Sequence, residues 1–272
     1  MLPSRLLPPT FDPGSVWLVG AGPGDPGLLT LHAAHALEQA DIVLHDALVS
    51  DEILSLAPQA ILEHAGKRAG GTRTPQLRIN QRLIQLARQG LRVVRLKGGD
   101  PLVFGRGGEE ALALAAAGIP FRIVPGISAG LGGTAAAGIP ITHRGLARSV
   151  AFATGHDSSG DLAGLDWAAL ARGAEVLVLY MAQRQIGAIA ERLIAAGRPP
   201  DDHVALISDA TTPRQAVTLT TLCDAQREAT ASAAPLLIVI GPVVALRPLL
   251  VSFQQTEPMT LRREAHQKRG TP

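Results

Sequence analysis

The stretch LKGGDPLVFGRGGEE, residues 96–110, decides how this chain is interpreted, because it is a glycine-rich loop placed directly after an apolar run. Arg92–Leu96 has the composition of a buried strand, and the carboxyl ends of strands are where open α/β sheets bind ligands. Five glycines fall within residues 97–110. So many glycines cost backbone entropy on folding if only a connection is required. We therefore favour a ligand-binding loop over a solvated surface loop.

Individual residues of this loop suit a polar ligand. Gly98 and Gly99 allow a ligand to lie against the backbone, and Asp100 supplies an acceptor for ribose hydroxyls or a cationic amine. Arg106 and Glu109 are spaced so that both can project into the same opening.

Short apolar runs alternate with helical patterns on both sides of the loop, which predicts an α/β fold. Before a turn-rich stretch at 138–147 we expect buried strands at Val16–Val19, Ile42–His45, Arg92–Leu96 and Phe121–Val124, with a weaker one at Ile61–Glu63. After it we expect strands at Val150–Thr154, Val176–Met181, Val204–Ser208, Ala216–Thr221 and Leu236–Ile240. Amphipathic helices are expected at 75–89 and 184–196.

This pattern predicts two α/β domains with mostly parallel strands. We place a flexible segment at 1–14, the first domain at 15–143, the second at 144–252 and a disordered tail at 253–272. About 15 residues precede the first expected strand, so we expect no further domain fused ahead of it.

Composition narrows the class of protein. The chain has 272 residues, of which 46% are hydrophobic, enough for one large domain or two ordinary ones and too many for a disordered chain. Its one cysteine, Cys223, excludes an intramolecular disulfide framework and a cysteine-based zinc or iron–sulfur site. We expect a reducing compartment and no metal.

The basic charge lies in the tail. The chain has 25 basic and 23 acidic residues, and residues 253–272 account for four and two of them, which leaves 21 of each (25 − 4 and 23 − 2). An even balance argues against a nucleic-acid partner.

Nothing in the sequence predicts a membrane protein. The longest apolar stretch, Leu236–Leu246, has 11 residues and contains Pro242, whereas a membrane span needs roughly 18 apolar residues. The N-terminus lacks an apolar core of signal-peptide length. We therefore expect a cytoplasmic protein.

A second glycine-rich loop, residues 20–27, follows the first expected strand. A nicotinamide or flavin site is one interpretation, with Asp46, at the end of the second strand, as the ribose-binding acid. However, the spacing G-x-G-x-x-G from Gly20 fails at Asp25, which would also repel a pyrophosphate. We expect a flat or uncharged ligand, and a tight turn without a ligand stays open.

A third segment, residues 124–138, offers almost no side chains. Ser128 and Ala129 at a helix start can present N–H groups to a ligand. Alternatively, the segment is a helix packed tightly against another backbone. Both interpretations stay open.

Five motifs in this order and spacing resemble those of the tetrapyrrole methylase family, which uses S-adenosylmethionine. They are VGAGPGDPGLLTL (19–31), ADIVLHDALVS (40–50), GKRAGG (66–71), LKGGDPLVFGRGGEE (96–110) and VPGISA (124–129). The resemblance extends from about Val16 to Arg247. It implies two α/β domains, a methyl donor bound in the cleft between them, and a homodimer.

The resemblance also assigns residues to the methyl donor. They are Pro23, Gly98, Gly99, Asp100, Val103, Ser128, Ala129, Met181 and Ala210. The family often has Thr where this chain has Ser128, a change that keeps the hydroxyl. A largely apolar adenosine needs backbone contacts and small residues more than charges, which agrees with these residue types.

For catalysis, Asp46 and Lys67 match family positions assigned as proton acceptor and proton donor. A solvated loop lysine is the alternative for Lys67. A tetrapyrrole substrate carries acetate and propionate groups, which arginines bind well. Our candidates are Arg106, which is also a catalytic candidate, and Arg144, with Glu109 orienting Arg106 or meeting a pyrrole N–H. An interdomain salt bridge is the alternative for Arg144.

The activity that the resemblance implies is methylation of uroporphyrinogen III at C-2 and C-7, through precorrin-1, to precorrin-2. Such a product leads to cobalamin or siroheme. Methylation of a later corrin precursor is the alternative within the family. A donor-binding module without catalysis and a nicotinamide oxidoreductase are alternatives outside it.

Overall fold

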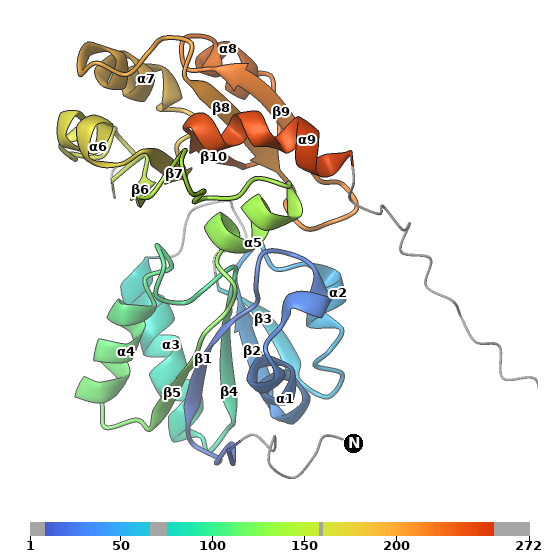
Figure 1. The fold of residues 1–272 in the computed structure, drawn as a ribbon. Helices are drawn as coiled ribbons and strands as arrows, with labels where there is room; N and C mark the ends of the chain where they lie inside the picture. The colour runs from blue at the N-terminus through green and yellow to red at the C-terminus, as the bar shows by residue number, and fades with distance from the viewer. Residues whose placement is uncertain (1–8, 66–74, 158–159, 253–272) are drawn as a thin grey trace, which may run out of the picture.

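The computed structural model describes residues 9–65, 75–157 and 160–252. It contains two five-stranded sheets, one above the other in Figure 1. Most of the expected flexible segment 1–14 and the whole expected tail 253–272 lie outside the described residues. No helix of the described part is long and apolar enough to span a bilayer.

The first sheet is entirely parallel and has the order β3-β2-β4-β1-β5. Its strands are β1 (Val16–Gly20), β2 (Ile42–His45), β3 (Ile61–His64), β4 (Val93–Lys97) and β5 (Phe121–Val124). Its helices are η2 (Pro26–Leu28), α1 (Leu31–Gln39), α2 (Asp51–Leu54), α3 (Gln76–Arg88), α4 (Gly107–Ala116) and α5 (Ala129–Ala136). The parallel sheet confirms the sequence prediction for this half.

Helices cover both faces of this sheet. Residues of α1 and α2 pack with Val19, Val43 and Val94 on one face, and residues of α3 and α4 pack with Leu18 and Val93 on the other. The central strands β1 and β4 are buried at every position, as continuous apolar runs predict. β5 was predicted to be buried, but this is wrong for its first three residues, which are exposed because β5 is an edge strand.

The second sheet has the order β6-β7-β10-β8-β9 and is mixed. Its strands are β6 (Val150–Thr154), β7 (Val176–Tyr180), β8 (His203–Ser208), β9 (Ala216–Thr221) and β10 (Leu236–Ile240). Its helices are α6 (Trp167–Gly173), α7 (Ile186–Ala195), α8 (Ala225–Thr230), η3 (Pro242–Leu246) and α9 (Arg247–Val251).

Only β6 and β7 pair in parallel in this sheet, whereas β10 runs antiparallel to β7 and β8, and β8 antiparallel to β9. The prediction of mostly parallel strands is therefore wrong for this half. The seven residues between β8 and β9 are too few for a parallel crossover, which needs a dozen or more, so these strands form a hairpin.

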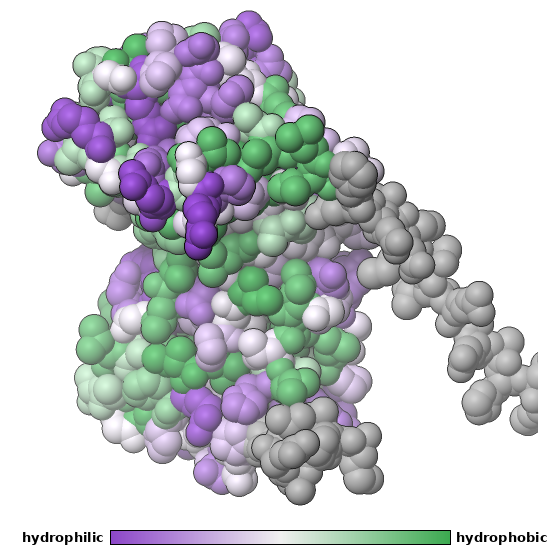
Figure 2. All heavy atoms as spheres, in the orientation of Figure 1, coloured by the Kyte–Doolittle hydropathy of each residue, from purple (hydrophilic) through white to green (hydrophobic). Residues whose placement is uncertain are grey.

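Helix α5 lies between the two sheets in Figure 1, and apolar residues gather along the narrow waist there in Figure 2. Its glycines allow the close approach. An ideal Cβ on Gly133 would be 2.9 Å from the Ala210 Cβ, and one on Gly130 would be 2.3 Å from the Tyr180 hydroxyl. The third segment is therefore a helix packed tightly against its neighbours, and the prediction that Ser128 and Ala129 at its start meet a ligand stays a prediction.

Candidate active site

The two glycine-rich loops are joined to each other at the carboxyl edge of the first sheet. Gly22 N–H donates to the Gly99 carbonyl (3.1 Å) and Gly99 N–H donates to the Gly22 carbonyl (2.7 Å). Ala21 N–H also donates to the Lys97 carbonyl at 2.7 Å. Both loops thus form one ordered backbone unit.

The third segment closes on this unit without space for side chains. An ideal Cβ on Gly126 would lie 2.2 Å from the Gly99 carbonyl oxygen, and one on Gly20 would lie 2.5 Å from the Gly126 Cα. Asp100 completes the junction, because its carboxylate accepts hydrogen bonds from Leu102 N–H (2.8 Å) and Gly126 N–H (3.1 Å). The carboxylate that we expected to meet a ligand therefore also holds the loop.

Bare backbone faces open space beside this junction. An ideal Cβ on Gly98 would meet only the Leu48 Cβ, at 3.8 Å, and one on Gly99 would point at the Ala129 nitrogen, 3.6 Å away. Pro23 lies against the same helix start, since its Cγ would be 2.9 Å from a Cβ on Gly132. Pro23, Gly98 and Gly99 thus form a patch with little side-chain cover, which we call the glycine cradle.

The second half forms the opposite wall. The Tyr180 hydroxyl hydrogen-bonds with Ser128 Oγ at 2.5 Å and accepts from Gly130 N–H at 2.7 Å. Met181 follows with a left-handed φ of +52° and a side chain that is 44% exposed. The Phe104 ring, from the second loop, lies 5.0 Å from the Tyr180 ring. Burial, the largest cause, raises the pKa of Tyr180, so its hydroxyl stays protonated.

Residues 210–212 contact the first loop directly. Asp25 N–H donates to Thr211 Oγ1 at 3.0 Å, and a Cβ on Gly24 would lie 2.8 Å from Thr212 Cγ2. The structure thus brings together seven of the residues predicted to hold the donor, from both halves: Pro23, Gly98, Gly99, Asp100, Ser128, Ala129 and Ala210. Val103 lies in the second loop and Met181 directly follows Tyr180, and both are exposed.

A buried ion cluster lies beside this cradle. Arg95 and Lys97 on β4 have side chains only 2% and 3% exposed, and both hydrogen-bond Glu110 Oε1 on α4, at 2.9 and 3.2 Å. Asp46, which follows β2, pairs with Arg95 at 2.5 Å and with Lys97 at 3.7 Å. Its side chain is 36% exposed, so it connects the buried cluster to the surface.

Burial has a direct consequence for the lysine. Desolvation, and then the charge of Arg95, lower the pKa of Lys97, while Glu110 and Asp46 oppose this shift. The second oxygen of Glu110, Oε2, is buried and has no hydrogen-bond partner among the described residues. Perturbed buried groups next to a cleft are typical of functional sites.

Sequence reasoning identified Asp46 but missed its partners Arg95, Lys97 and Glu110. A signal was present in VVRLK, residues 93–97. Two cations at alternate positions of an apolar strand share one face of it, and buried cations require nearby carboxylates.

Arg106 and Glu109 pair with each other. Arg106 Nε and Nη2 donate to the two Glu109 carboxylate oxygens at 2.8 and 2.7 Å, and both side chains are about half exposed. This hydrogen bonding raises the pKa of Arg106 and lowers that of Glu109. Arg106 precedes α4 in a left-handed conformation, with φ of +61°.

Arg144 is exposed and lies in the segment that connects the halves, next to the backbone hydrogen bonds between His143 and Ala147. No salt bridge of Arg144 with a described residue is seen, so the interdomain ion pair considered above has no support. Lys67 lies outside the described residues.

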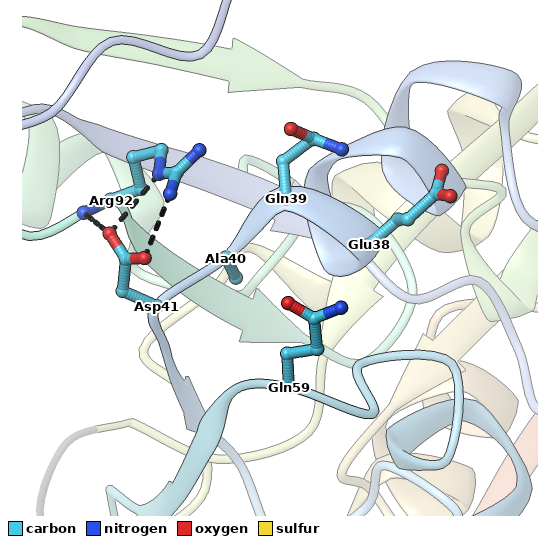
Figure 3. Close-up of a pocket in the computed structure, with 6 residues that line it drawn as sticks. All are labelled: Glu38, Gln39, Ala40, Asp41, Gln59 and Arg92. Atoms are coloured by element: carbon cyan, nitrogen blue, oxygen red, sulfur yellow. Dashed lines mark hydrogen bonds and ion pairs between the residues drawn. The ribbon is translucent and has the colours of Figure 1, made fainter.

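A polar cavity of about 220 Å³ occupies the opposite edge of the first sheet (Figure 3). It is lined by Glu38, Gln39, Ala40, Asp41, Gln59 and Arg92. Asp41 and Arg92 hydrogen-bond each other there at 2.7 to 3.1 Å. This cavity lies at the amino ends of the strands, away from the loops described above, and ligands of open α/β sheets bind at the carboxyl ends.

Comparison with known proteins agrees with this geometry. The sequence pattern of the family Tetrapyrrole (Corrin/Porphyrin) Methylases matches residues 15–226. The chain belongs to the tetrapyrrole methylase family. Its two-domain α/β fold is that of a tetrapyrrole methylase.

Among individual relatives, a uroporphyrinogen-III C-methyltransferase of Sinorhizobium sp is 57% identical over 89% of this chain and 88% of its own length. A siroheme synthase of Neisseria meningitidis serogroup B is 53% identical over 88% of this chain. The chain spans half the length of that relative.

One solved structure extends the comparison to a bound ligand. Uroporphyrin-III C-methyltransferase of Thermus thermophilus, complexed with S-adenyl homocysteine, is 39% identical to this tetrapyrrole methylase. The match has a TM-score of 0.76 and covers 85% of this chain and 99% of the Thermus chain.

Proposed function

We propose that this chain is an S-adenosylmethionine-dependent C-methyltransferase that converts uroporphyrinogen III to precorrin-2, by way of precorrin-1, through methylation at C-2 and C-7. The observation that carries the proposal is the 57% identity to the Sinorhizobium enzyme over nearly the whole of both chains. The glycine cradle supports it, because it offers backbone to a flat nucleoside.

The methyl donor would be held by the residues gathered around that cradle. Gly98 and Gly99 offer bare backbone, and the partly exposed Val103 and Met181 offer apolar contact from the two halves. When bound, S-adenosylmethionine supplies a methyl group on a cationic sulfur, which leaves as a neutral thioether with the electron pair of the broken C–S bond. The protein's task is then to align the reacting atoms and exclude water.

The carboxylates of the substrate would be bound by arginines. Arg106 and Arg144 are both exposed, and a guanidinium binds a carboxylate through two parallel hydrogen bonds. Glu109 holds the Arg106 guanidinium in a fixed orientation through two hydrogen bonds. A substrate carboxylate would meet the face of Arg106 that Glu109 leaves open.

A proton must leave the ring after each methylation. When the pyrrole carbon attacks the methyl group, the new C–C bond leaves the ring cationic, and loss of a meso proton restores conjugation. Asp46 is the residue we assign to accept it, since its carboxylate is partly exposed and held by Arg95. We assign Lys67 as proton donor on the family resemblance alone.

Two further assignments complete the proposal. We propose a homodimer, for which the family resemblance and a partly apolar groove beside α5, lined in part by Leu131 and Leu250, give support. The expected cytoplasmic location rests on the single cysteine, which suits a reducing compartment. Gel filtration with light scattering tests the first, and cell fractionation the second.

The decisive experiment is incubation with uroporphyrinogen III and S-adenosylmethionine under anaerobic conditions, with absorbance and mass readouts. Two successive gains of a methyl group, ending at precorrin-2, are expected. Unchanged uroporphyrinogen III together with methylation of a later corrin precursor would instead indicate the sister activity. No methylation of either, with S-adenosylmethionine still bound, would indicate a binding module.

A further inference from the structure

The buried cluster has more cations than its buried acid can balance. Arg95 and Lys97 point from β4 toward the face covered by α3 and α4, where Glu110 is fully buried. One buried carboxylate against two buried cations leaves one positive charge, and an uncompensated buried charge is costly. The Asp46 carboxylate, which pairs with both cations, supplies the second negative charge of the cluster.

The two cations divide the oxygens of Asp46 between them. Arg95 Nη2 lies 2.5 Å from Oδ1, and Lys97 Nζ lies 3.7 Å from Oδ2. Both oxygens of the carboxylate therefore face a cation. These two contacts fix the orientation of the carboxylate, while the Asp46 side chain stays partly exposed.

Glu110 keeps those cations in place through a single oxygen. Glu110 Oε1 accepts from Arg95 Nε (2.9 Å), from Lys97 Nζ (3.2 Å) and from Gln76 Nε2 of α3 (3.0 Å). No described residue donates a hydrogen bond to Glu110 Oε2. The hydrogen bonds that the Glu110 carboxylate accepts from described residues therefore all reach Oε1, which contacts both cations. The second loop covers Lys97, since a Cβ on Gly105 would lie 3.2 Å from Lys97 Cε.

Among residues 9–65, 75–157 and 160–252, Asp46 forms ion pairs with Arg95 and Lys97 alone. The His45 ring nitrogen Nδ1 lies 3.2 Å from the Asp46 carbonyl oxygen, and the His64 ring lies 5.2 Å from the His45 ring. At the start of α4, Arg106 and Glu109 pair with each other, and their charges also interact with Glu110 and Lys97 of the cluster. Within the described part of the chain, the charges in direct contact with the Asp46 carboxylate are those of Arg95 and Lys97.

From this geometry we propose that Lys97 and Glu110 are positioning residues, which orient the Asp46 carboxylate and set the pH at which it can accept a proton. The proposal rests on the proposed function for the role of Asp46 in the reaction. The charge coupling itself does not, because it follows from distances within the cluster.

The test compares Lys97→Met and Glu110→Gln with the unaltered protein. The protonation midpoint of Asp46 is measured by ¹³C NMR on protein labelled at the aspartate carboxyls, with Asp46→Asn identifying the signal. Lys97→Met removes a cation, so the midpoint rises by about one pH unit, the lower end of the effect of a nearby opposite charge. Glu110→Gln leaves both cations to Asp46 alone, so the midpoint falls.

The pH profile of kcat is the second readout. Its acidic limb is expected to move in the same directions, and Lys97→Arg, which keeps the cation, is expected to restore the unaltered profile. Arg227→Met is the matched control, because Arg227 pairs with Asp224 at 2.9 Å in the second half of the chain. It should leave the midpoint unchanged.

Opposite shifts in Lys97→Met and Glu110→Gln support the proposal, and equal or absent shifts overturn it. If Lys97→Met does not fold, as judged by circular dichroism, the Glu110→Gln midpoint decides alone: a fall supports the coupling and no change refutes it. NMR shifts without any methylation of uroporphyrinogen III by the unaltered protein would refute the proposed function while leaving the charge coupling intact.

Discussion

The two ends of strand β4 carry ion pairs of different kinds. At the amino end, just before the strand, Arg92 meets Asp41 through its backbone N–H, Nε and Nη2, and both side chains are about one-third exposed (Figure 3). At the carboxyl end, Arg95 and Lys97 are buried and share one oxygen of Glu110. At the amino end, one cation, Arg92, pairs with one acid, Asp41. At the carboxyl end, two cations share one buried acid, and their charges are balanced only when the partly exposed Asp46 is counted as well.

This difference in charge balance distinguishes an ion pair that only supports the fold from charged groups that belong to the candidate active site. A matched and solvated pair contributes little to stability and has no reason to change its protonation. A buried cluster that depends on one partly exposed carboxylate responds strongly when that carboxylate gains a proton. The glycine cradle lies at the same end of the strand. We therefore expect changes at the carboxyl end to exceed those at the amino end.

The largest effect is expected from Gly126→Ala, where the loops meet. The new Cβ would clash with the backbone of Gly99 and Gly20, which cannot move aside as a side chain can. We expect a loss of about 3 kcal/mol in the free energy of unfolding, measured by urea denaturation. Gly108→Ala is the control, because nothing lies within 4 Å of its Cβ. Equal stability of the two variants would contradict the tight junction.

A change in the cradle itself is expected to affect binding but not folding. In Gly98→Ala the methyl group enters open space, so the free energy of unfolding should change by less than about 0.5 kcal/mol. The methyl group would lie where we propose that the donor binds. We expect the Kd for S-adenosylhomocysteine to rise about 30-fold, which is about 2 kcal/mol. Unchanged affinity in titration calorimetry would place the donor elsewhere.

The link between the halves is tested by Tyr180→Phe. Loss of the hydroxyl removes the partner of Ser128 Oγ and of Gly130 N–H. We expect a loss of about 1 kcal/mol in the free energy of unfolding.

The same residue gives a pH dependence with a defined sign. Burial raises the pKa of Tyr180 in the folded state, so the unfolded chain loses this proton first as the pH rises. The stabilisation is therefore complete below pH 10 and declines above it. Tyr180→Phe should lack this decline, and a decline as steep as in the unaltered protein would contradict the assignment.

The smallest effect is expected from Asp41→Asn at the amino end. Hydrogen bonds from Arg92 lower the pKa of Asp41, so its contribution is present above the usual aspartate value and is lost as the pH falls through the folded-state value. Because the pair is partly solvated, we expect less than about 1 kcal/mol at neutral pH. Methylation should be unchanged; a large loss of turnover would remove the distinction between the two ends.

Much of the fold could be predicted from the sequence. Ile42–His45, Phe121–Val124 and Leu236–Ile240 are strands with the expected bounds, because short apolar runs that contain β-branched residues favour buried strands. The direction of β10 could not be predicted, since a continuous apolar run suits a central strand of either direction. β10 lies between β7 and β8, so the strand order depends on which segment of the chain pairs with these two strands. The residue composition of β10 does not determine this pairing.

The candidate site divides in the same way. The loop at 96–110 signals itself by its glycines, so Gly98, Gly99 and Asp100 could be proposed from local sequence. Arg95 and Glu110 belong to one cluster although they are 15 positions apart, because β4 and α4 pack against each other. Contacts of this kind form only when α4 packs on the sheet. The sequence therefore pointed to Asp46 but not to Arg95 and Glu110, the buried residues of the same cluster.

The paired hydrogen bonds between Gly22 and Gly99 have a consequence for how tightly a nucleoside is captured. Flexible loops must lose conformational entropy when they close around a ligand, and that loss subtracts from affinity. Here the two loops are already fastened to each other and to Gly126 through Asp100. If the methyl donor binds at these loops, as we propose, the entropy of ordering them is lost on folding, and less of it subtracts from the affinity for the donor.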